Sequence, residues 1–295
     1  MSPTLRLITC ALLAGLPSVH VAADTSTPVP IEQALLLGVD GKLTIDQQGV
    51  PSGYEIKTKL PQKLHDSLEQ RVRSWRFEPV LIGGKPVIAS TAMHVTLAAL
   101  GTGDDYRVSV DSVSFPQTQG QAPDASGEPL MPTIVKFRGR PDPPDYPRDA
   151  FRRGLEADVL VYLRLRSDGH VDQATVAQVA LLNAKGKPSD LNGAAKLFER
   201  EALSIVPSWR FDVTVNVPNP TASDMTIAVP LSFRLGDARP RDVWQHEART
   251  AKRRAPWLPA DPAATAVGVA DLANGEYAPA ASRFRLIAPV TGSAL

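Results

Sequence analysis

The chain has 295 residues, with 32 Lys and Arg against 31 Asp and Glu, so its formal net charge is +1. Sequence-independent binding to nucleic acid depends on an excess of positive charge, and this balance argues against that class of protein. The hydrophobic fraction of 43% and the charged fraction of 21% are those of an ordinary globular protein of one or two domains.

The first 23 residues have the pattern of a secretory signal peptide. Arg6 accompanies an apolar run from Leu5 to Leu16, and Val21-Ala22-Ala23 supplies the small residues of a cleavage site. The run is shorter than the roughly 20 apolar residues that span a membrane. We therefore expect residues 1–23 to be removed and the protein to reside in the periplasm, without Cys10, its only cysteine. The alternative is an uncleaved N-terminus, which would anchor the protein in the inner membrane and be its only membrane contact.

Two segments of the chain end in nearly the same five-residue sequence, Ser-Trp-Arg-Phe-Glu at residues 74–78 and Ser-Trp-Arg-Phe-Asp at residues 208–212. An Asp-Gly pair precedes each, at Asp40-Gly41 and at Asp168-Gly169. The pairs are 128 residues apart and the tryptophans 134, so the second copy has six more residues between the two landmarks. The shared order predicts an internal duplication, with a turn at each Asp-Gly pair.

The second copy has a clear pattern of strands and helix. Apolar residues alternate with others over residues 159–165, which predicts a strand, and residues 171–179 are expected to return from the turn. A helix follows, because apolar residues recur at spacings of four, four and three at Phe198, Ala202, Val206 and Trp209. Alternation over residues 225–235 predicts the last strand.

The first copy repeats the helical spacing at Leu64, Leu68, Val72 and Trp75, with a weaker final strand over residues 93–97. The predicted fold class is therefore α+β, with two small antiparallel three-stranded sheets in tandem, each covered by helix on one face. The large apolar residues at the helix ends are expected in the cores: Trp75, Phe77, Phe198, Trp209 and Phe211.

The expected organisation has a repeat at residues 24–115, a linker at 116–140, the second copy at 141–236 and an irregular tail at 237–295. The linker is rich in Pro, Gln, Gly and Ser, and the tail has no sustained periodicity. The basic residues of the tail, Arg249, Lys252, Arg253 and Arg254, are expected to be solvated.

No set of residues suggests catalysis. The histidines are scattered without the spacing of zinc ligands, and no nucleophile, base and orienting group can be assembled. Ile82-Gly83-Gly84-Lys85 lacks the remaining residues of a phosphate-binding loop and predicts a hairpin turn. We therefore expect no enzyme activity, no cofactor and no metal.

An ordered set of motifs in the second copy resembles the C-terminal domain of the TonB family. The motifs are Tyr146-Pro147, then Ala150 and Gly154, the Asp168-Gly169 turn with Val171, the helix segment Phe198-Glu199-Arg200-Glu201, and Trp209-Arg210. The first copy shares only the turn, the helix and Trp-Arg-Phe-Glu-Pro, so it resembles a degenerate copy of the same domain.

The resemblance implies a protein that binds protein. Members of the family bind outer-membrane receptors, and a short receptor segment adds as a strand beside the last strand of the sheet. The resemblance also implies a link to energy-dependent transport. By resemblance, the edge strand comprises Thr226, Ile227, Ala228, Val229, Leu231 and Phe233, and the opening motif that contacts the partner comprises Pro143, Pro144 and Tyr146.

A structural function is the alternative. Pro230 lies inside the expected edge strand and has no N–H with which to pair an added strand. The two copies would then use their sheet edges internally or in a homodimer, without energy transduction.

Overall fold

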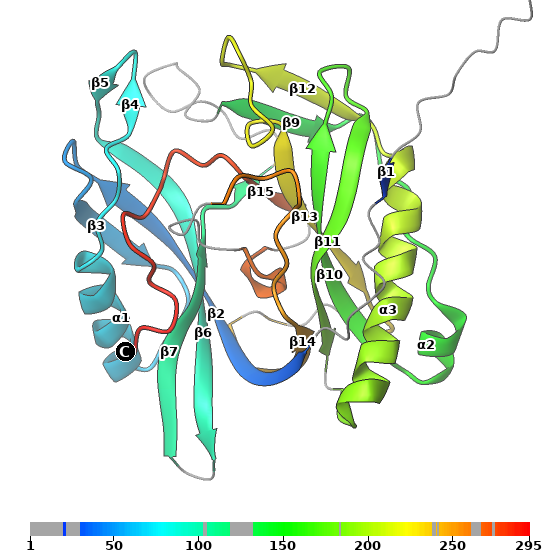
Figure 1. Cartoon of the computed structure of the whole chain (residues 1–295). Coiled ribbons are helices and arrows are strands. Elements are labelled where there is room, and N and C mark those ends of the chain that lie inside the picture. Colours follow the sequence, from blue (N-terminus) through cyan, green and yellow to red (C-terminus); the bar gives the residue numbers. More distant parts are fainter. Residues whose placement is uncertain are drawn as a thin grey trace, which may run out of the picture.

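The computed structural model describes residues 20–21, 30–102, 105–118, 132–182, 184–237, 240, 242–260, 267–272 and 275–295. Most of the predicted signal segment and residues 119–131 of the predicted linker lie outside these ranges. The fold is α+β, as expected, and consists mainly of antiparallel sheet. Figure 1 shows helices α1 and α3 on opposite flanks, with the C-terminal part of the chain, orange to red, between them.

The first copy forms a sheet in the order β3-β2-β6-β7. Its elements are β2 (Ile31–Ile45), β3 (Pro51–Ile56), α1 (Gln62–Arg73), the hairpin of β4 (Leu81–Ile82) and β5 (Lys85–Pro86), β6 (Ala89–Thr102) and β7 (Asp105–Ser114). Gly83 and Gly84 join β4 to β5 with φ of 55° and 76°, as a two-residue hairpin requires. The predicted hairpin is confirmed.

The second copy has the equivalent order β11-β10-β13-β15. Its own elements are β9 (Thr133–Phe137), α2 (Arg148–Arg152), β10 (Glu156–Leu165), β11 (Val171–Leu182), α3 (Pro188–Ile205), the 3₁₀ turn η1 (Val206–Ser208), β12 (Phe211–Val215) and β13 (Thr226–Phe233). Helix α3 begins at Pro188, where the missing N–H would have had no helical acceptor. It packs on β10 and β11.

The tail supplies strands to the main sheet, which corrects the expectation that residues 237–295 are irregular. Strand β14 (Gln245–Thr250) pairs with β2 on one side and β11 on the other, and η2 (Val269–Asp271) and β15 (Glu276–Pro279) follow it. Because β14 bridges the copies, the two expected three-stranded sheets are parts of one sheet, which has 11 strands in the described part of the chain.

The predicted linker also contains secondary structure. Strand β8 (Gln117–Thr118) pairs with β15, and β9 pairs with β12 along five residues of each strand. At the N-terminus, β1 (His20–Val21), inside the predicted signal segment, pairs in parallel with β11.

The two copies have equivalent strand orders, but one of the landmarks predicted for the duplication is wrong. Asp40 and Gly41 lie inside β2 and form no turn. A Cβ on Gly41 would lie 2.5 Å from Tyr54 Cε2, so close packing requires this glycine. The turn equivalent to Gly169 contains Gly49, 120 residues earlier, and the tryptophans are 134 apart, so the second copy has 14 more residues between these points.

Each copy has its own apolar core between helix and sheet. Phe198, Trp209 and Phe211 are buried in the core of the second copy, and Trp75 and Phe77 in that of the first. The tail completes the first core with Phe284 and Leu286. A third cluster lies on the other face of the sheet, where Val269 and Leu272 cover β10 and β11 residues. The two copies are therefore packed together through the tail.

Among the helices of the described residues, none is both long and apolar enough to cross a membrane.

Candidate partner-binding strand

Strand β13 has two differently oriented sets of backbone groups. The Met225 carbonyl accepts a bond of 2.8 Å from the Leu165 amide, just before β13 runs beside β10. The next carbonyl, that of Thr226, accepts a bond of 2.9 Å from the Ala280 amide on the opposite side. Because backbone groups alternate along an antiparallel strand, odd-numbered residues of β13 pair with β10 and even-numbered residues face away from it.

The side chains of β13 also alternate between two buried clusters. Those of the odd-numbered residues lie in the core beneath α3: Ile227, Val229, Leu231 and Phe233. Ala228 lies in the cluster on the opposite face, with Leu160 and Tyr162. The six residues predicted from the family resemblance are therefore buried by the chain itself, and a partner strand would meet the backbone of β13.

The predicted edge is not open along its whole length. Strand β15 runs antiparallel to β13 on the side away from β10, pairing Pro279 with Ile227 and Ala278 with Ala228. This strand comes from the tail, for which no strand was predicted at these residues. It occupies the position beside the last strand at which an added segment would lie.

The missing N–H of Pro230 removes no hydrogen bond between β13 and β10. Pro230 lies opposite Leu160, and by the alternation its nitrogen faces away from β10. The ladder between β13 and β15 ends at Ala228 of β13. The next residue of β13 whose backbone faces away from β10 is Pro230. A residue without an amide proton thus follows the end of that ladder.

The predicted opening motif contacts the far end of β13. The Tyr146 hydroxyl donates a bond of 2.5 Å to the Leu155 carbonyl, and its ring lies 6.0 Å from that of Phe233 between centroids. Pro143 is exposed and Pro144 is half-buried. The structure therefore brings Tyr146 to the Phe233 end of the strand, whereas β15 lies at the Ile227 end.

The equivalent strand of the first copy has a longer neighbour. Strand β6 pairs with β7 from His94 opposite Ser114 to Thr102 opposite Asp105. A partner segment cannot add to this part of β6 without displacing β7. Only the second copy has its last strand covered by so short a segment.

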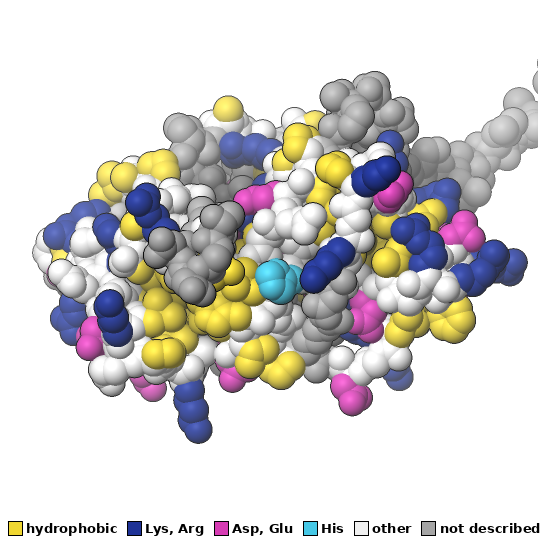
Figure 2. Space-filling model, turned by 90° about the horizontal axis from the view of Figure 1, so that it is seen from below, with side chains coloured by type: hydrophobic (Ala, Val, Ile, Leu, Met, Phe, Trp, Pro, Cys, Tyr) yellow, Lys and Arg dark blue, Asp and Glu magenta, His cyan; other side chains and the backbone are white. Residues whose placement is uncertain are grey.

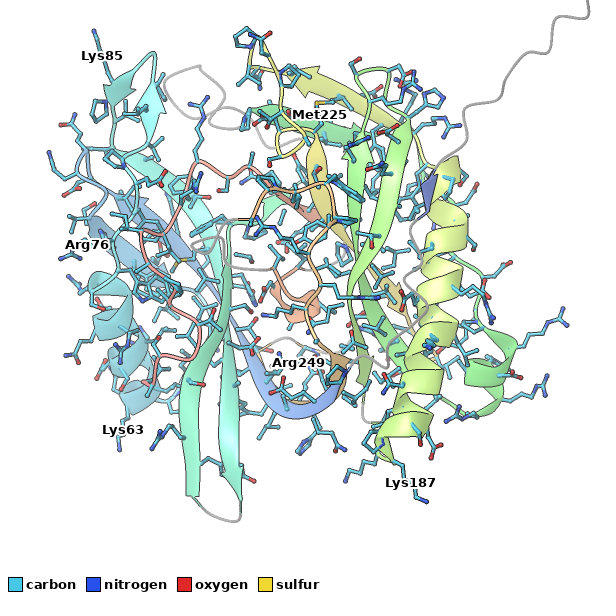
Figure 3. The ribbon with its side chains drawn as sticks, viewed as in Figure 1. Lys63, Arg76, Lys85, Lys187, Met225 and Arg249 are labelled. Carbon is cyan, nitrogen blue, oxygen red and sulfur yellow. The ribbon has the colours of Figure 1, made fainter. Side chains whose placement is uncertain are left out.

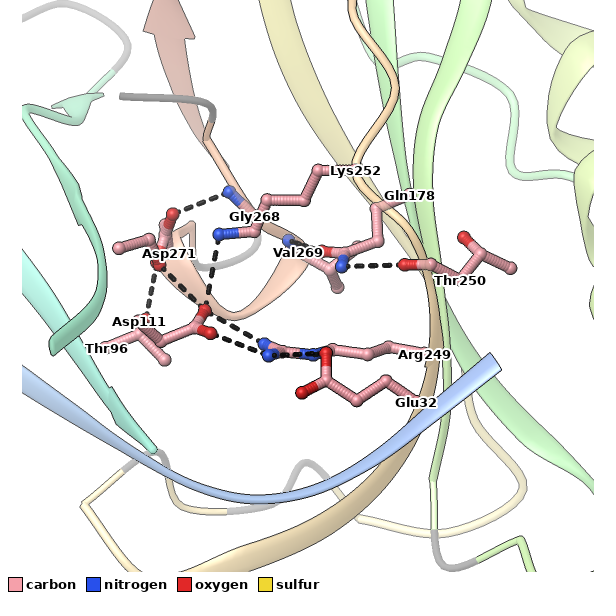
Figure 4. A network of polar contacts seen from close by, with 11 residues as sticks. Glu32, Thr96, Asp111, Gln178, Arg249, Thr250, Lys252, Gly268, Val269 and Asp271 are labelled. Atoms are coloured by element: carbon pink, nitrogen blue, oxygen red, sulfur yellow. Dashed lines mark hydrogen bonds and ion pairs between the residues drawn. The ribbon is translucent and has the colours of Figure 1, made fainter. Parts of the chain in front are cut away.

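A buried ion-pair network joins the copies (Figures 3 and 4). Arg249 of β14 donates from Nη1 and Nη2 to Asp111 of β7 at 2.9 and 2.6 Å, and from Nη2 to Glu32 of β2 at 3.2 Å. Lys252 Nζ lies 3.2 Å from the same Asp111. Burial alone would raise the pKa of Asp111, but the hydrogen bond from Arg249 and the charge of Lys252 hold it below its usual value. Arg249 and Lys252 therefore form ion pairs, contrary to the expectation that they are solvated, and Arg253 likewise pairs with Glu199 at 2.9 Å.

A second polar group of the tail is fully buried against β6 and β7. Asp271 of η2 accepts hydrogen bonds from Thr96 Oγ1, from Ser112 Oγ at 2.6 Å and from the Gly268 amide at 2.6 Å. Beside it, Gln178 of β11 accepts from the Val269 amide and donates to the Thr250 carbonyl, both at 3.0 Å. These bonds fix η2 between the copies.

A cleft of about 580 Å³ lies between the two copies and the tail. Its walls combine apolar residues such as Val80, Tyr162 and Phe284 with Lys252 and Arg254, and Pro279 of β15 also lines it. Within the described residues, no group of three or more His, Cys, Asp or Glu side chains could hold a metal ion. On the face in Figure 2, basic and acidic side chains are interspersed.

Comparison with known proteins gives one partial similarity. A 77-residue stretch is 35% identical to "Protein TonB" of Pseudomonas aeruginosa, covering 26% of this chain and 19% of that protein. The chain thus spans about a fifth of the length of the relative that it matches. No protein-family model and no solved structure matches the chain. The similarity supports a TonB-like domain in this chain, which the motifs of the second copy also predict.

Sequence reasoning missed the residues that cover β13. Tyr277, Ala278 and Pro279 belong to a four-residue strand, too short to give a periodic signal. The alternation of an aromatic and a small residue between Gly275 and Pro279 is the only local sign of it.

Proposed function

We propose that the protein is a periplasmic protein-binding module of the TonB type, without enzyme activity, that binds an extended segment of an envelope or outer-membrane partner by strand addition to β13. A role in energy-dependent transport would follow if the partner is a transport receptor. The observation that carries the proposal is the position of β13: it is the last strand of the TonB-like copy, and its outer side already holds an added strand, β15.

Two further observations support it. The partial similarity to TonB concerns a family whose members bind receptors in this way, according to the resemblance described above. In addition, β15 shows that the backbone of Thr226 and Ala228 accepts a strand that is distant in sequence. Backbone pairing of this kind depends little on the partner's identity, and alternate side chains provide selectivity.

Site-specific photocrosslinking tests the proposal. A photoreactive residue in place of Pro230, which is half-buried and whose backbone nitrogen faces the outer side of β13, should capture an envelope protein through a segment near its N-terminus. The same residue in place of Tyr106, which is 55% exposed on β7, is the matched control and should not. Mass spectrometry of the adducts identifies partner and segment. Capture of equal amounts of the same proteins at both positions would contradict the proposal.

Asp substitutions at Val229 or Leu231 would be poor tests, because both side chains lie in the core beneath α3. A charge there would unfold the domain whether or not a partner binds.

The second candidate is a structural protein with no transducing function. The observation that favours it is the internal use of both edges, because β7 covers β6 and β15 covers part of β13. In that case the crosslinker at Pro230 would join only to the chain's own tail or to a second copy, and sedimentation would show whether a dimer forms.

A further inference from the structure

We infer that β15 is an internal ligand of the partner site, and that the partner segment β13 accepts has the pattern of β15: an aromatic residue followed by a small one, antiparallel to β13. The inference rests on the proposed function. It adds that β15 competes with the partner segment for β13, and that the site selects partner segments by their side chains. It follows from how β15 is held and from what its side chains contact.

β15 has a shorter ladder with β13 than β7 has with β6, although it also pairs with β8 on its other side. Two residue pairs join it to β13, and the Ala280 amide donates to Thr226 just beyond them. In the first copy, nearly the whole of β7 pairs with residues 94–102 of β6. The first copy therefore has a long strand beside the later part of its last strand, whereas the second has a short one that a competing strand can displace.

The two inner side chains of β15 enter different clusters. Tyr277 is 5% exposed and joins the core beneath α3, where its hydroxyl accepts a bond of 3.3 Å from the Val135 amide. Burial raises the pKa of Tyr277, so the hydroxyl is neutral at physiological pH. Ala278 enters the cluster on the opposite face, beside Tyr162 and Ala228. The site thus has one buried position for an aromatic ring and another buried position for a small side chain.

The backbone of β15 adds a third requirement. Ala280 donates to Thr226, so by alternation the amide of Ala278 faces β13 and the nitrogen of Pro279 faces away. A segment that binds here needs an amide proton at the small residue, whereas proline is tolerated next to it. Because β15 is tethered to the same chain, it competes at an effective concentration on the order of millimolar.

A peptide-binding experiment tests the inference. The probe is a fluorescent synthetic peptide with the sequence of residues 275–281, Gly-Glu-Tyr-Ala-Pro-Ala-Ala, added to the full mature chain. Ala278→Pro removes the amide that faces β13 and frees the site, so this variant should bind the peptide at least ten-fold more tightly than wild type. Ala278→Ser keeps the amide and is the matched control, and it should bind as wild type does. A peptide with Ser in place of the tyrosine should lose most of the binding to Ala278→Pro.

A locked variant keeps the test decisive if Ala278→Pro does not fold. Ala228 and Ala278 are directly opposed, and hydrogen-bonded pairs of this kind have Cα atoms about 5.5 Å apart, within disulfide range. The double variant Ala228→Cys/Ala278→Cys should bind no peptide when oxidised and regain wild-type binding on reduction, whereas neither single variant should respond to reductant.

Two results would overturn the inference: equal peptide affinity of wild type and a folded Ala278→Pro, or peptide binding to the oxidised double variant. Equal binding of the tyrosine and serine peptides would overturn the selectivity. The crosslinking result separates this inference from the proposed function. Capture of the envelope partner by the oxidised double variant would refute an internal competitor while leaving strand addition in place. Release of β15 without any partner capture would refute the proposed function alone.

Discussion

Gly49 and Gly169 occupy equivalent places in the two copies, and each accepts a backbone hydrogen bond of 2.9 Å, from Phe77 and Phe211 respectively. Their φ values are 78° and 86°, in the left-handed region. A Cβ would lie 2.0 Å from the Phe77 carbonyl oxygen at Gly49 and 1.8 Å from that of Phe211 at Gly169. In each copy, the same backbone hydrogen bond thus joins the turn to the segment that follows the helix.

Gly169→Ala should therefore destabilise the protein by about 2–4 kcal/mol, because backbone strain and a clash with a main-chain oxygen add. Gly154→Ala is the matched control, since Gly154 has a φ of 62° but nothing lies within 4 Å of an added Cβ. Gly154→Ala should lower the free energy of unfolding only by the cost of a left-handed backbone conformation at alanine, about 1–2 kcal/mol. Urea unfolding of both variants measures the difference, and equal costs would mean that the contact with Phe211 is unimportant.

Arg249 should be the most costly ion-pair residue to remove. Its side chain is 7% exposed and that of Asp111 is 13% exposed, so Arg249→Met leaves a buried carboxylate with Lys252 as its one remaining cationic partner among the described residues. Breaking a buried pair in this way costs about 3–5 kcal/mol. Arg138→Ala, which removes an exposed pair with Asp212, should cost at most about 1 kcal/mol. The double variant Arg249→Met/Asp111→Leu should recover much of the loss in thermal unfolding; no recovery would show that Arg249 acts through other contacts.

The sequence predicted the elements whose signal is local. Alternation indicated β10, β11 and β13, and helical spacing indicated α1 and α3. It did not predict β14, because Gln-His-Glu-Ala-Arg-Thr looks like a solvated segment until Asp111 and Glu32 are placed beside Arg249. The same limit applies to the candidate site. The position of β13 followed from the pattern, whereas its coverage by β15 depends on a contact between distant residues.

The two equivalent tryptophans should respond differently to replacement by phenylalanine. Trp209 Nε1 donates a bond of 3.1 Å to the Asp142 carbonyl, whereas Trp75 Nε1 is buried without a hydrogen-bond partner among the described residues. Both changes lose apolar contact, but Trp209→Phe also loses a hydrogen bond and Trp75→Phe removes an unsatisfied donor. Trp209→Phe should therefore cost about 1–3 kcal/mol more in chemical denaturation. Equal costs would indicate that the Trp209 bond adds no net stability.

Glu247 on β14 should make the protein less stable as the pH rises. Burial raises its pKa to about 7, with a further contribution from the charge of Asp158 on β10. Asp111 also raises this pKa, whereas Arg249 and Arg234 oppose the shift. The native state thus binds more protons than the unfolded state between the ordinary glutamate pKa and about 7, so the free energy of unfolding falls across that range and the loss is complete above it.

Glu247→Gln should abolish this loss. Because Glu247 is half-buried, we expect the variant to be more stable than wild type by about 1–3 kcal/mol at pH 8 and equally stable at pH 4. Glu55→Gln, which removes an exposed glutamate from β3, controls for the change in net charge. Urea midpoints measured from pH 4 to pH 8 give the comparison. If Glu247→Gln and wild type kept a constant difference over that range, the carboxyl group of Glu247 would not titrate differently in the native and unfolded states, and the prediction would be wrong.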